Sequence, residues 1–256
     1  MRNEFITLLI HTLQMLPTEW LGILMYGAAI GIFFSLHRYF GKEGIFLFII
    51  VAVIIANLQS LKAIELTFFD YPIAMGSILF TLCLFAVDVI SEYYGKESAI
   101  KAIWLGFAGM LMLSLIMLLT LGTQVINAAP DSSYYHYVQV HDAMALLFTP
   151  TPALFSASLI SYLVSQYIDM GFFLWLKKRW GERLLAFRTL LSTVLSTGVD
   201  NCLFSFLAWR VLYPLPIDFK SFLMTYIFGA FGLRVILSVV NSPLIYLARR
   251  QWEPAR

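Results

Sequence analysis

Residues 73–96 read IAMGSILFTLCLFAVDVISEYYGK, an apolar run that carries two acids near its end, Asp88 and Glu92, and stops at Lys96. Its apolar part approaches the ~20 residues that an α-helix needs to cross ~30 Å of hydrocarbon. The whole chain has this character: of its 256 residues, 60% are apolar and 12% are charged, whereas soluble domains have about 45–50% and about 25%. Strands of a membrane barrel would show only ~10 alternating residues. The sequence therefore predicts an all-α polytopic membrane protein.

About seven hydrophobic segments are long enough to be transmembrane helices. They are residues 20–36, 45–61, 73–89, 99–122, 145–176, 190–212 and 222–247.

Basic residues predict how these segments are oriented, because cytoplasmic loops carry an excess of Lys and Arg. Twelve of the 17 basic residues fall on one side of the predicted topology, and the longest loop of the other side, residues 123–142, has none. This asymmetry predicts an N-terminus outside and a C-terminus in the cytoplasm. The twelve are Arg38, Lys42, Lys96, Lys101, Lys177, Lys178, Arg179, Arg183, Arg188, Arg249, Arg250 and Arg256.

Several classes of function are disfavoured by composition. A net charge of +2 is too small to suggest nucleic-acid binding. Cys83 and Cys202 are single thiols within apolar segments, so we expect neither a disulfide nor a metal site. We expect no cofactor and no enzymatic activity. We also expect no cleavable signal peptide, because the apolar stretch 5–16 is short and lacks a small-residue cleavage site.

Four acids within or at the edge of the apolar segments are the strongest functional signal: Asp88, Glu92, Asp169 and Asp200. A charge in hydrocarbon costs roughly 2.5–3.5 kcal/mol on insertion scales. We therefore expect these acids to face a partly hydrated internal cavity, where they bind a small polar solute. Glu92 has a second interpretation as an interfacial anchor, because two tyrosines follow it.

Helix geometry predicts the depth of each acid at 1.5 Å per residue. Asp88 and Asp169 lie roughly 12 Å from the basic end of their segments and Asp200 roughly 18 Å. These depths predict that three acids from three helices meet in one cavity. Arg234 is the candidate cation that could neutralise Asp169 or Asp200.

Neutral polar residues supply further candidates for contact with a solute. The amides of Asn57, Gln166 and Asn201 each offer donors and an acceptor. The hydroxyls of the segment 190–212 are better interpreted as hydrogen bonds between helices. The interruption at residues 241–243, with its proline, could contact solute or relieve packing strain.

The same positions carry a resemblance to a known family. The run Asp88–Lys96, preceded by Gly76 and Phe80, resembles the signature of the queuosine precursor transporters, also called the vitamin uptake transporter or YhhQ-like family. Three further stretches match in order and extend the resemblance over about four fifths of the chain. They are Ala56-Asn57 with Lys62; Ser165–Asp169; and Arg188 with Ser192-Thr193 and Asp200–Phe204.

The resemblance implies uptake of 7-deazaguanine bases, the precursors or salvage form of the tRNA nucleoside queuosine, across a bacterial inner membrane. It also implies a six-helix core, residues 41–256, similar to the substrate-capture subunits of energy-coupling-factor transporters, with residues 1–40 as an extension carrying an extra transmembrane helix. Arg188 joins the implied substrate site. Two departures bear on substrate preference: Asn201 replaces a common hydroxyl residue, and Thr189-Leu190 stand where Asn is frequent.

The chemistry of the acids suits such a base. One carboxylate can accept both the imino N–H and the exocyclic amine of a guanine-like edge, and such charge-assisted bonds are roughly twice as strong as neutral ones. Gln166 or Asn57 could bind the keto oxygen or the pyrrole N–H. The energy source stays open between proton or cation coupling and a separate energy-coupling module.

Two other functions compete with transport. Asp169 and Asp200 could form an intramembrane aspartyl protease, in which two acids share a proton and activate water. A proton or cation channel would require rings of charge along one path, whereas the polar residues here are clustered along the sequence.

Overall fold

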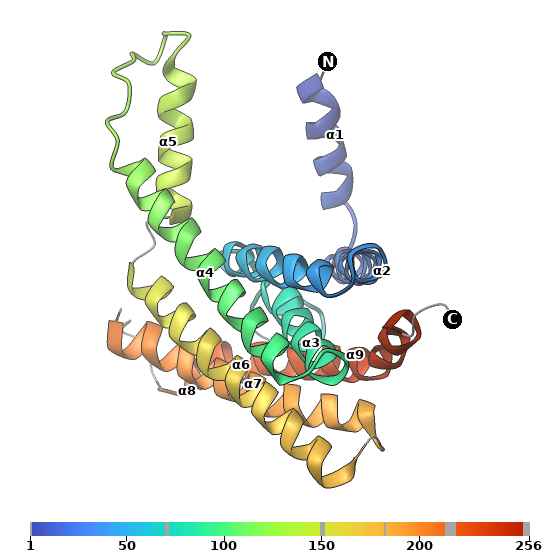
Figure 1. Cartoon of the computed structure of the whole chain (residues 1–256). Coiled ribbons are helices and arrows are strands. Elements are labelled where there is room, and N and C mark those ends of the chain that lie inside the picture. Colours follow the sequence, from blue (N-terminus) through green and yellow to red (C-terminus); the bar gives the residue numbers. More distant parts are fainter. Residues whose placement is uncertain (1, 70–71, 149–151, 182, 213–218, 253–256) are drawn as a thin grey trace.

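The computed structural model describes residues 2–69, 72–148, 152–181, 183–212 and 219–252. They form a helical bundle from which two helices project on the same side, α1 (Arg2–Gln14) and α5 (Tyr135–Phe148) (Figure 1). In this part of the chain, five helices are long and apolar enough to cross a membrane. The protein is therefore a predominantly α-helical, multi-pass membrane protein. The five are Thr18–Gln59, Lys96–Leu121, Ser156–Trp180, Leu185–Leu212 and Ile227–Ala248.

The longest helix, α2 (Thr18–Gln59), is folded back on itself at Gly41. Gly41 has φ 57° and ψ −132°, a backbone conformation that is strained for any residue with a side chain. The two halves lie side by side, because Gln59 Nε2 lies 3.2 Å from Met25 Sδ. The predicted segments 20–36 and 45–61 are thus the two halves of α2, with Arg38 and Lys42 at the bend.

A short β-hairpin follows α2 and was not predicted. Strand β1 (Ala63–Ile64) pairs antiparallel with β2 (Ile73–Ala74), with Ala63 opposite Ala74. The predicted segment 73–89 therefore begins as a strand, and its helix α3 (Ser77–Tyr93) begins four residues later. Gly76, directly before this helix, packs closely against α2: a Cβ on it would lie 2.0 Å from the Ala56 carbonyl oxygen.

Helix α3 is the centre of the bundle. Every residue from Ser77 to Ser91 is buried, and the helix contacts α2, α4 (Lys96–Leu121), α6 (Pro152–Trp180), α7 (Leu185–Phe206) and α9 (Ala230–Trp252). A helix that is apolar all round is expected at such a position. Asp88 is consequently enclosed by protein rather than by lipid.

The predicted segment 145–176 is wrong at its start. Residues 145–148 are the end of α5, and α6 begins at Pro152; residues 149–151 lie outside the described part. Proline lacks the N–H that a helix interior requires but fits the first turn, so Pro152 favours a new helix there. The loop predicted at 123–142 likewise contains the first half of α5.

The last two segments widen into π-helical turns. Helix α7 continues as η1 (Leu207–Leu212), and α8 (Phe219–Phe222) with η2 (Leu223–Gly229) leads into α9. The predicted boundaries 190–212 and 222–247 fall within these elements.

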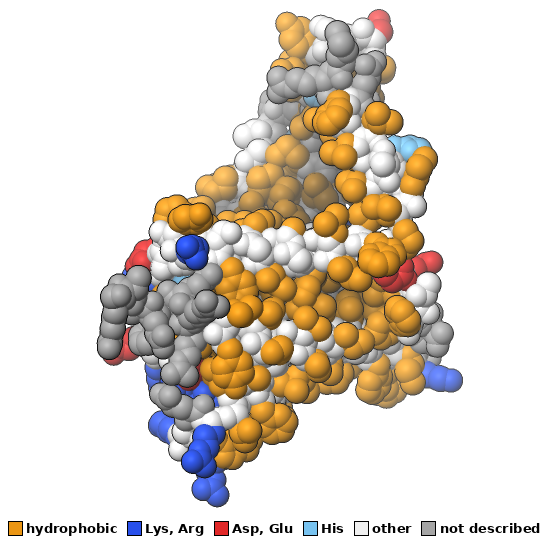
Figure 2. All heavy atoms as spheres, turned by 90° about the vertical axis from the view of Figure 1, so that its right-hand side faces the viewer, with side chains coloured by type: hydrophobic (Ala, Val, Ile, Leu, Met, Phe, Trp, Pro, Cys, Tyr) orange, Lys and Arg blue, Asp and Glu red, His pale blue; other side chains and the backbone are white. Residues whose placement is uncertain are grey.

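The outer surface agrees with a lipid environment. Figure 2 shows one face of the molecule largely covered by hydrophobic side chains, with Lys and Arg gathered mainly toward its lower left edge. Large exposed side chains include Trp20, Ile32, Leu119, Trp175 and Ile236.

Candidate functional site

Helix α7 carries a continuous buried polar stripe. Its members recur every three or four residues, so they lie on one side of the helix. From the first to the last residue the stripe rises by about 25 Å, most of the thickness of a bilayer core. It connects a charged network at one end of the bundle with a cavity at the other. The stripe consists of Arg188, Thr189, Ser192, Thr193, Ser196, Thr197, Asp200, Asn201 and Ser205.

Two carboxyl groups meet the middle of this stripe. Asp88 from α3 and Asp169 from α6 are both fully buried and lie within hydrogen-bonding reach of one another. Ser196 Oγ donates to Asp169 Oδ1 at 2.8 Å, and Ser192 Oγ donates to Asp88 Oδ2 at 3.2 Å. Two helices that are distant in sequence thus present their acids to the hydroxyls of a third.

A charged network closes one end of the stripe. Arg188 Nη2 lies 3.1 Å from Glu92 Oε1, and Lys177 Nζ lies 3.0 Å from Glu92 Oε2. Arg188 also donates to the carbonyl oxygen of Gly181 at 2.9 Å and stacks on Phe173, 5.1 Å from the ring centroid. The Glu92 side chain is only 8% exposed. The Glu92 carboxylate is therefore buried and forms ion pairs with both cations.

The fourth acid has a partner of its own. Asp200 Oδ2 pairs with Arg234 Nη1 of α9 at 2.5 Å, and the guanidinium lies 4.6 Å from the centroid of Phe80. The structure therefore brings Asp88 and Asp169 together but places Asp200 in an ion pair. Depth explains this division, because Asp200 lies roughly 6 Å farther along the bundle than the other two acids.

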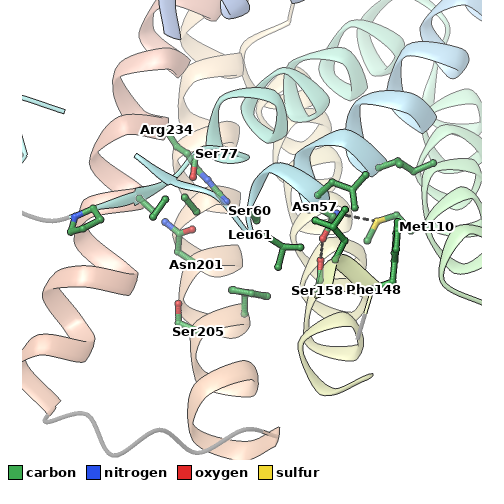
Figure 3. A pocket seen from close by; sticks show the side chains of 18 of the residues that line it. Asn57, Ser60, Leu61, Ser77, Met110, Phe148, Ser158, Asn201, Ser205 and Arg234 are labelled. Carbon is green, nitrogen blue, oxygen red and sulfur yellow. Dashed lines mark hydrogen bonds between the residues drawn. The ribbon is translucent and has the colours of Figure 1, made fainter. Parts of the chain in front are cut away.

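A cavity of about 590 Å³ occupies the hairpin end of the bundle (Figure 3). Two of the predicted site residues, Asn57 and Asn201, line it from opposite sides, and Arg234 forms part of its wall. Asn57 is anchored by a hydrogen bond from Ser158 Oγ to its Oδ1. The remaining predicted site residues do not line this cavity: Asp88, Glu92, Gln166, Asp169, Arg188 and Asp200.

Unpartnered polar atoms occur at the cavity wall and behind it. Within the described residues, Ser77 Oγ and Asn201 Nδ2 at the wall have no hydrogen-bond partner. The same holds for both amide atoms of the fully buried Gln166, one turn before Asp169 on α6. Buried polar groups are normally paired. These atoms therefore have free capacity to bind a polar guest or water.

Sequence reasoning missed Ser77 and Ser158 as cavity residues. The detectable signal was the small residue Gly76 before Ser77, since small residues mark places where membrane helices approach closely. Ser158 carried no such signal, because its role depends on the orientation of α6 toward Asn57.

The comparisons with known proteins now identify the family. A family model described as "Putative vitamin uptake transporter" matches residues 74–248. The chain belongs to this vitamin uptake transporter family. It is similar to a Bacillus subtilis (strain 168) protein named "Probable queuosine precursor transporter", at 30% identity over 215 residues, which cover 84% of this chain and 87% of the relative. No solved structure matches the chain.

Membership and geometry together decide between the classes of function. The family is one of transporters, so the protein is a multi-pass membrane transporter with a small-molecule solute. The protease interpretation is not favoured, because Asp169 faces Asp88 while Asp200 pairs with Arg234. A channel is not favoured either, since the matched family model and relative are both described as transporters.

Proposed function

We propose that this transporter imports a 7-deazaguanine base, either a queuosine precursor or the salvaged base queuine, across a bacterial inner membrane for tRNA modification. The name of the similar Bacillus subtilis protein supports the substrate class. The observation that carries the proposal is the cavity at the hairpin end, with its opposed amides and its guanidinium. Its volume of about 590 Å³ lies within the range of about 300–1,000 Å³ that is usual for small-molecule sites.

The proposed topology has seven crossings. The halves of α2 supply two crossings, and α3, α4, α6, α7 and α9 supply one each. The N-terminus lies outside and the C-terminus in the cytoplasm, as the distribution of basic residues favours. In this orientation the cavity lies toward the outside and the network of Glu92, Arg188 and Lys177 toward the cytoplasm. Residues 1–40 are the extension with an extra helix, and residues 41–256 are the six-helix core.

The cavity wall supplies complementary groups for a guanine-like base. Arg234 and the Nδ2 of Asn201 can donate to the keto oxygen, while the amide oxygen of Asn57 can accept from an exocyclic amine. Apolar side chains such as Ile54, Met110 and Phe148 cover the flat faces. A base that lacks these polar groups would leave buried wall atoms unpaired, which is how such sites discriminate strongly.

The buried stripe is the proposed route from the cavity to the cytoplasm. After the base leaves the cavity, it contacts four polar residues along this route, and the ion pair between Glu92 and Arg188 then breaks to release it. The four are Asp88, Gln166, Asp169 and Asp200. All of these residues lie on helices that border α7 or belong to it. An intramembrane acid that faces the bundle interior is by default a functional residue.

Cells that cannot make queuosine precursors test the proposal. With the base supplied outside, expression of the transporter should restore tRNA queuosine, and purified protein should bind at least one of the nitrile precursor, the aminomethyl precursor and queuine. Asn201→Ala should weaken binding about 2- to 10-fold, the loss of one neutral hydrogen bond worth about 0.5–1.5 kcal/mol. The matched control Asn127→Ala changes an exposed loop residue that does not line the cavity. No response of tRNA modification and no binding of any base would refute the assignment.

A further inference from the structure

We infer that the Asp88–Asp169 pair binds one exchangeable proton, and that this proton is carried inward with the solute. The inference rests on the proposed import function and names its energy source. It concerns a site that does not line the solute cavity. Three independent features of the structure support it: the contact between the acids, an imbalance of buried charge, and polar atoms without hydrogen-bond partners beside the pair.

The contact itself requires a cation. The two carboxyls are within hydrogen-bonding reach and fully buried, and two carboxylates that close together cannot both stay ionised. Ser196 and Ser192 each contribute a single hydroxyl proton, to Asp169 Oδ1 and to Asp88. Asp169 Oδ2 has no donor among the described residues. A proton between the carboxyls supplies the missing donor.

The charge balance of the described bundle is short by one positive charge. Four acidic side chains are enclosed, and they are opposed by two buried cations, Arg188 and Arg234, and by the half-buried Lys177. Asp200 is neutralised by Arg234, and Glu92 is shared by Lys177 and Arg188. The Asp88–Asp169 pair is left with a charge that only one further monovalent cation would balance. Uncompensated charge inside a bilayer is costly, so a bound proton is the simplest solution.

The charged groups around the pair come from each packed helix. Glu92, one turn after Asp88 on α3, lies between Arg188 of α7 and Lys177 of α6. The buried cation of α9, Arg234, is held by Asp200. His37 of α2 contacts the Tyr94 hydroxyl at 3.1 Å instead of the acids. In the described part of these helices, therefore, no cationic side chain forms an ion pair with Asp88 or Asp169.

Polar side chains without hydrogen-bond partners offer a path for the proton between the acids and the cavity. Gln166 is fully buried one turn from Asp169 on the same face of α6, with both amide atoms unpartnered among the described residues. Thr197 Oγ1, adjacent to Ser196 and one turn from the cavity residue Asn201, is unpartnered in the same sense. The transfer is balanced: a proton leaves external water for a carboxylate oxygen, then leaves that oxygen for cytoplasmic water.

Proteoliposomes with the full chain test the inference. A pH-sensitive dye inside reports protons, the nitrile-bearing 7-deazaguanine is the solute, and valinomycin with equal potassium holds the membrane potential at zero. Adding base outside should acidify the lumen. An imposed pH difference should give about tenfold accumulation per pH unit at one proton per base. Asp169→Asn and Asp88→Asn should each lose acidification and the accumulation driven by the pH difference.

The controls separate this inference from the proposed function. Asp131→Asn removes an exposed acid and should leave acidification unchanged. Wild-type exchange of base without acidification, or accumulation driven by a sodium gradient instead of a pH difference, would overturn the inference while leaving import intact. Acidification that persists in both Asn variants would also overturn it. Wild-type protein that neither binds nor exchanges the base would refute import, and proton coupling with it. If a variant does not fold, the wild-type measurement still decides.

Discussion

The ion pair between Asp200 and Arg234 makes a direct prediction about stability at the residue scale. Arg234→Met should destabilise the protein by roughly 3–5 kcal/mol, because it leaves a buried carboxylate without its partner. The double variant Asp200→Asn, Arg234→Met should recover much of the loss, since no buried charge then remains unpaired. Thermal unfolding of the purified protein in detergent measures both.

A matched control for this prediction is Lys220→Met, which removes an exposed cation of α8. Changes at such positions usually stay within about 0.5 kcal/mol. If the double variant were no more stable than Arg234→Met alone, the ion pair would not be the cause of the loss.

Counting residues from the basic ends predicted that two of the acids would meet. It placed Asp88 and Asp169 at one depth of roughly 12 Å, and these two acids are the ones in contact. It could not assign Asp200 to Arg234 rather than to the pair, because that depends on how α7 and α9 are rotated about their axes. Side-chain direction is set by packing, which a single sequence does not specify.

The bend in α2 makes a prediction at the scale of an element. Gly41→Ala should cost about 1–3 kcal/mol of stability, because φ 57° with ψ −132° strains any residue that has a Cβ. Gly27→Ala in the same helix is the control: nothing lies within 4 Å of its added Cβ. This change should be neutral or should stabilise by up to about 1 kcal/mol. Equal effects of the two substitutions, measured by thermal unfolding in detergent, would contradict the assignment of the bend to Gly41.

Hydrophobic length predicted helices well but missed the shorter elements. The two halves of α2 were recognised because charges at residues 38 and 42 interrupt the apolar run. The β-hairpin was missed because its strands have only two residues each and are specified by pairing rather than by a repeating pattern. Helix α5 was assigned to a loop and to the next span, since its polar residues 135–142 lead directly into apolar ones.

The whole molecule is asymmetric along the direction of its helices. One end holds the hairpin and the cavity, and the other holds the network of Glu92, Arg188 and Lys177 together with most of the chain's basic residues. An acid shared by two cations can hold α3, α6 and α7 together at that end, while the cavity lies at the opposite end. In the proposed transport cycle, the Glu92 contacts break when the cavity closes. The proposed function and the proposed proton site both depend on which end faces the cytoplasm.

Labelling of single cysteines from either side of the membrane determines that orientation. In a background with Cys83 and Cys202 replaced by serine, Lys62→Cys introduces a thiol at the hairpin end and Leu184→Cys introduces one at the basic end; both positions are exposed. A membrane-impermeant maleimide added to intact cells should label Lys62→Cys. Leu184→Cys should react only after permeabilisation, because the proposed topology places the end rich in Lys and Arg in the cytoplasm. The opposite pattern would reverse the proposed topology, and the cavity would then face the cytoplasm as a site of release rather than of capture.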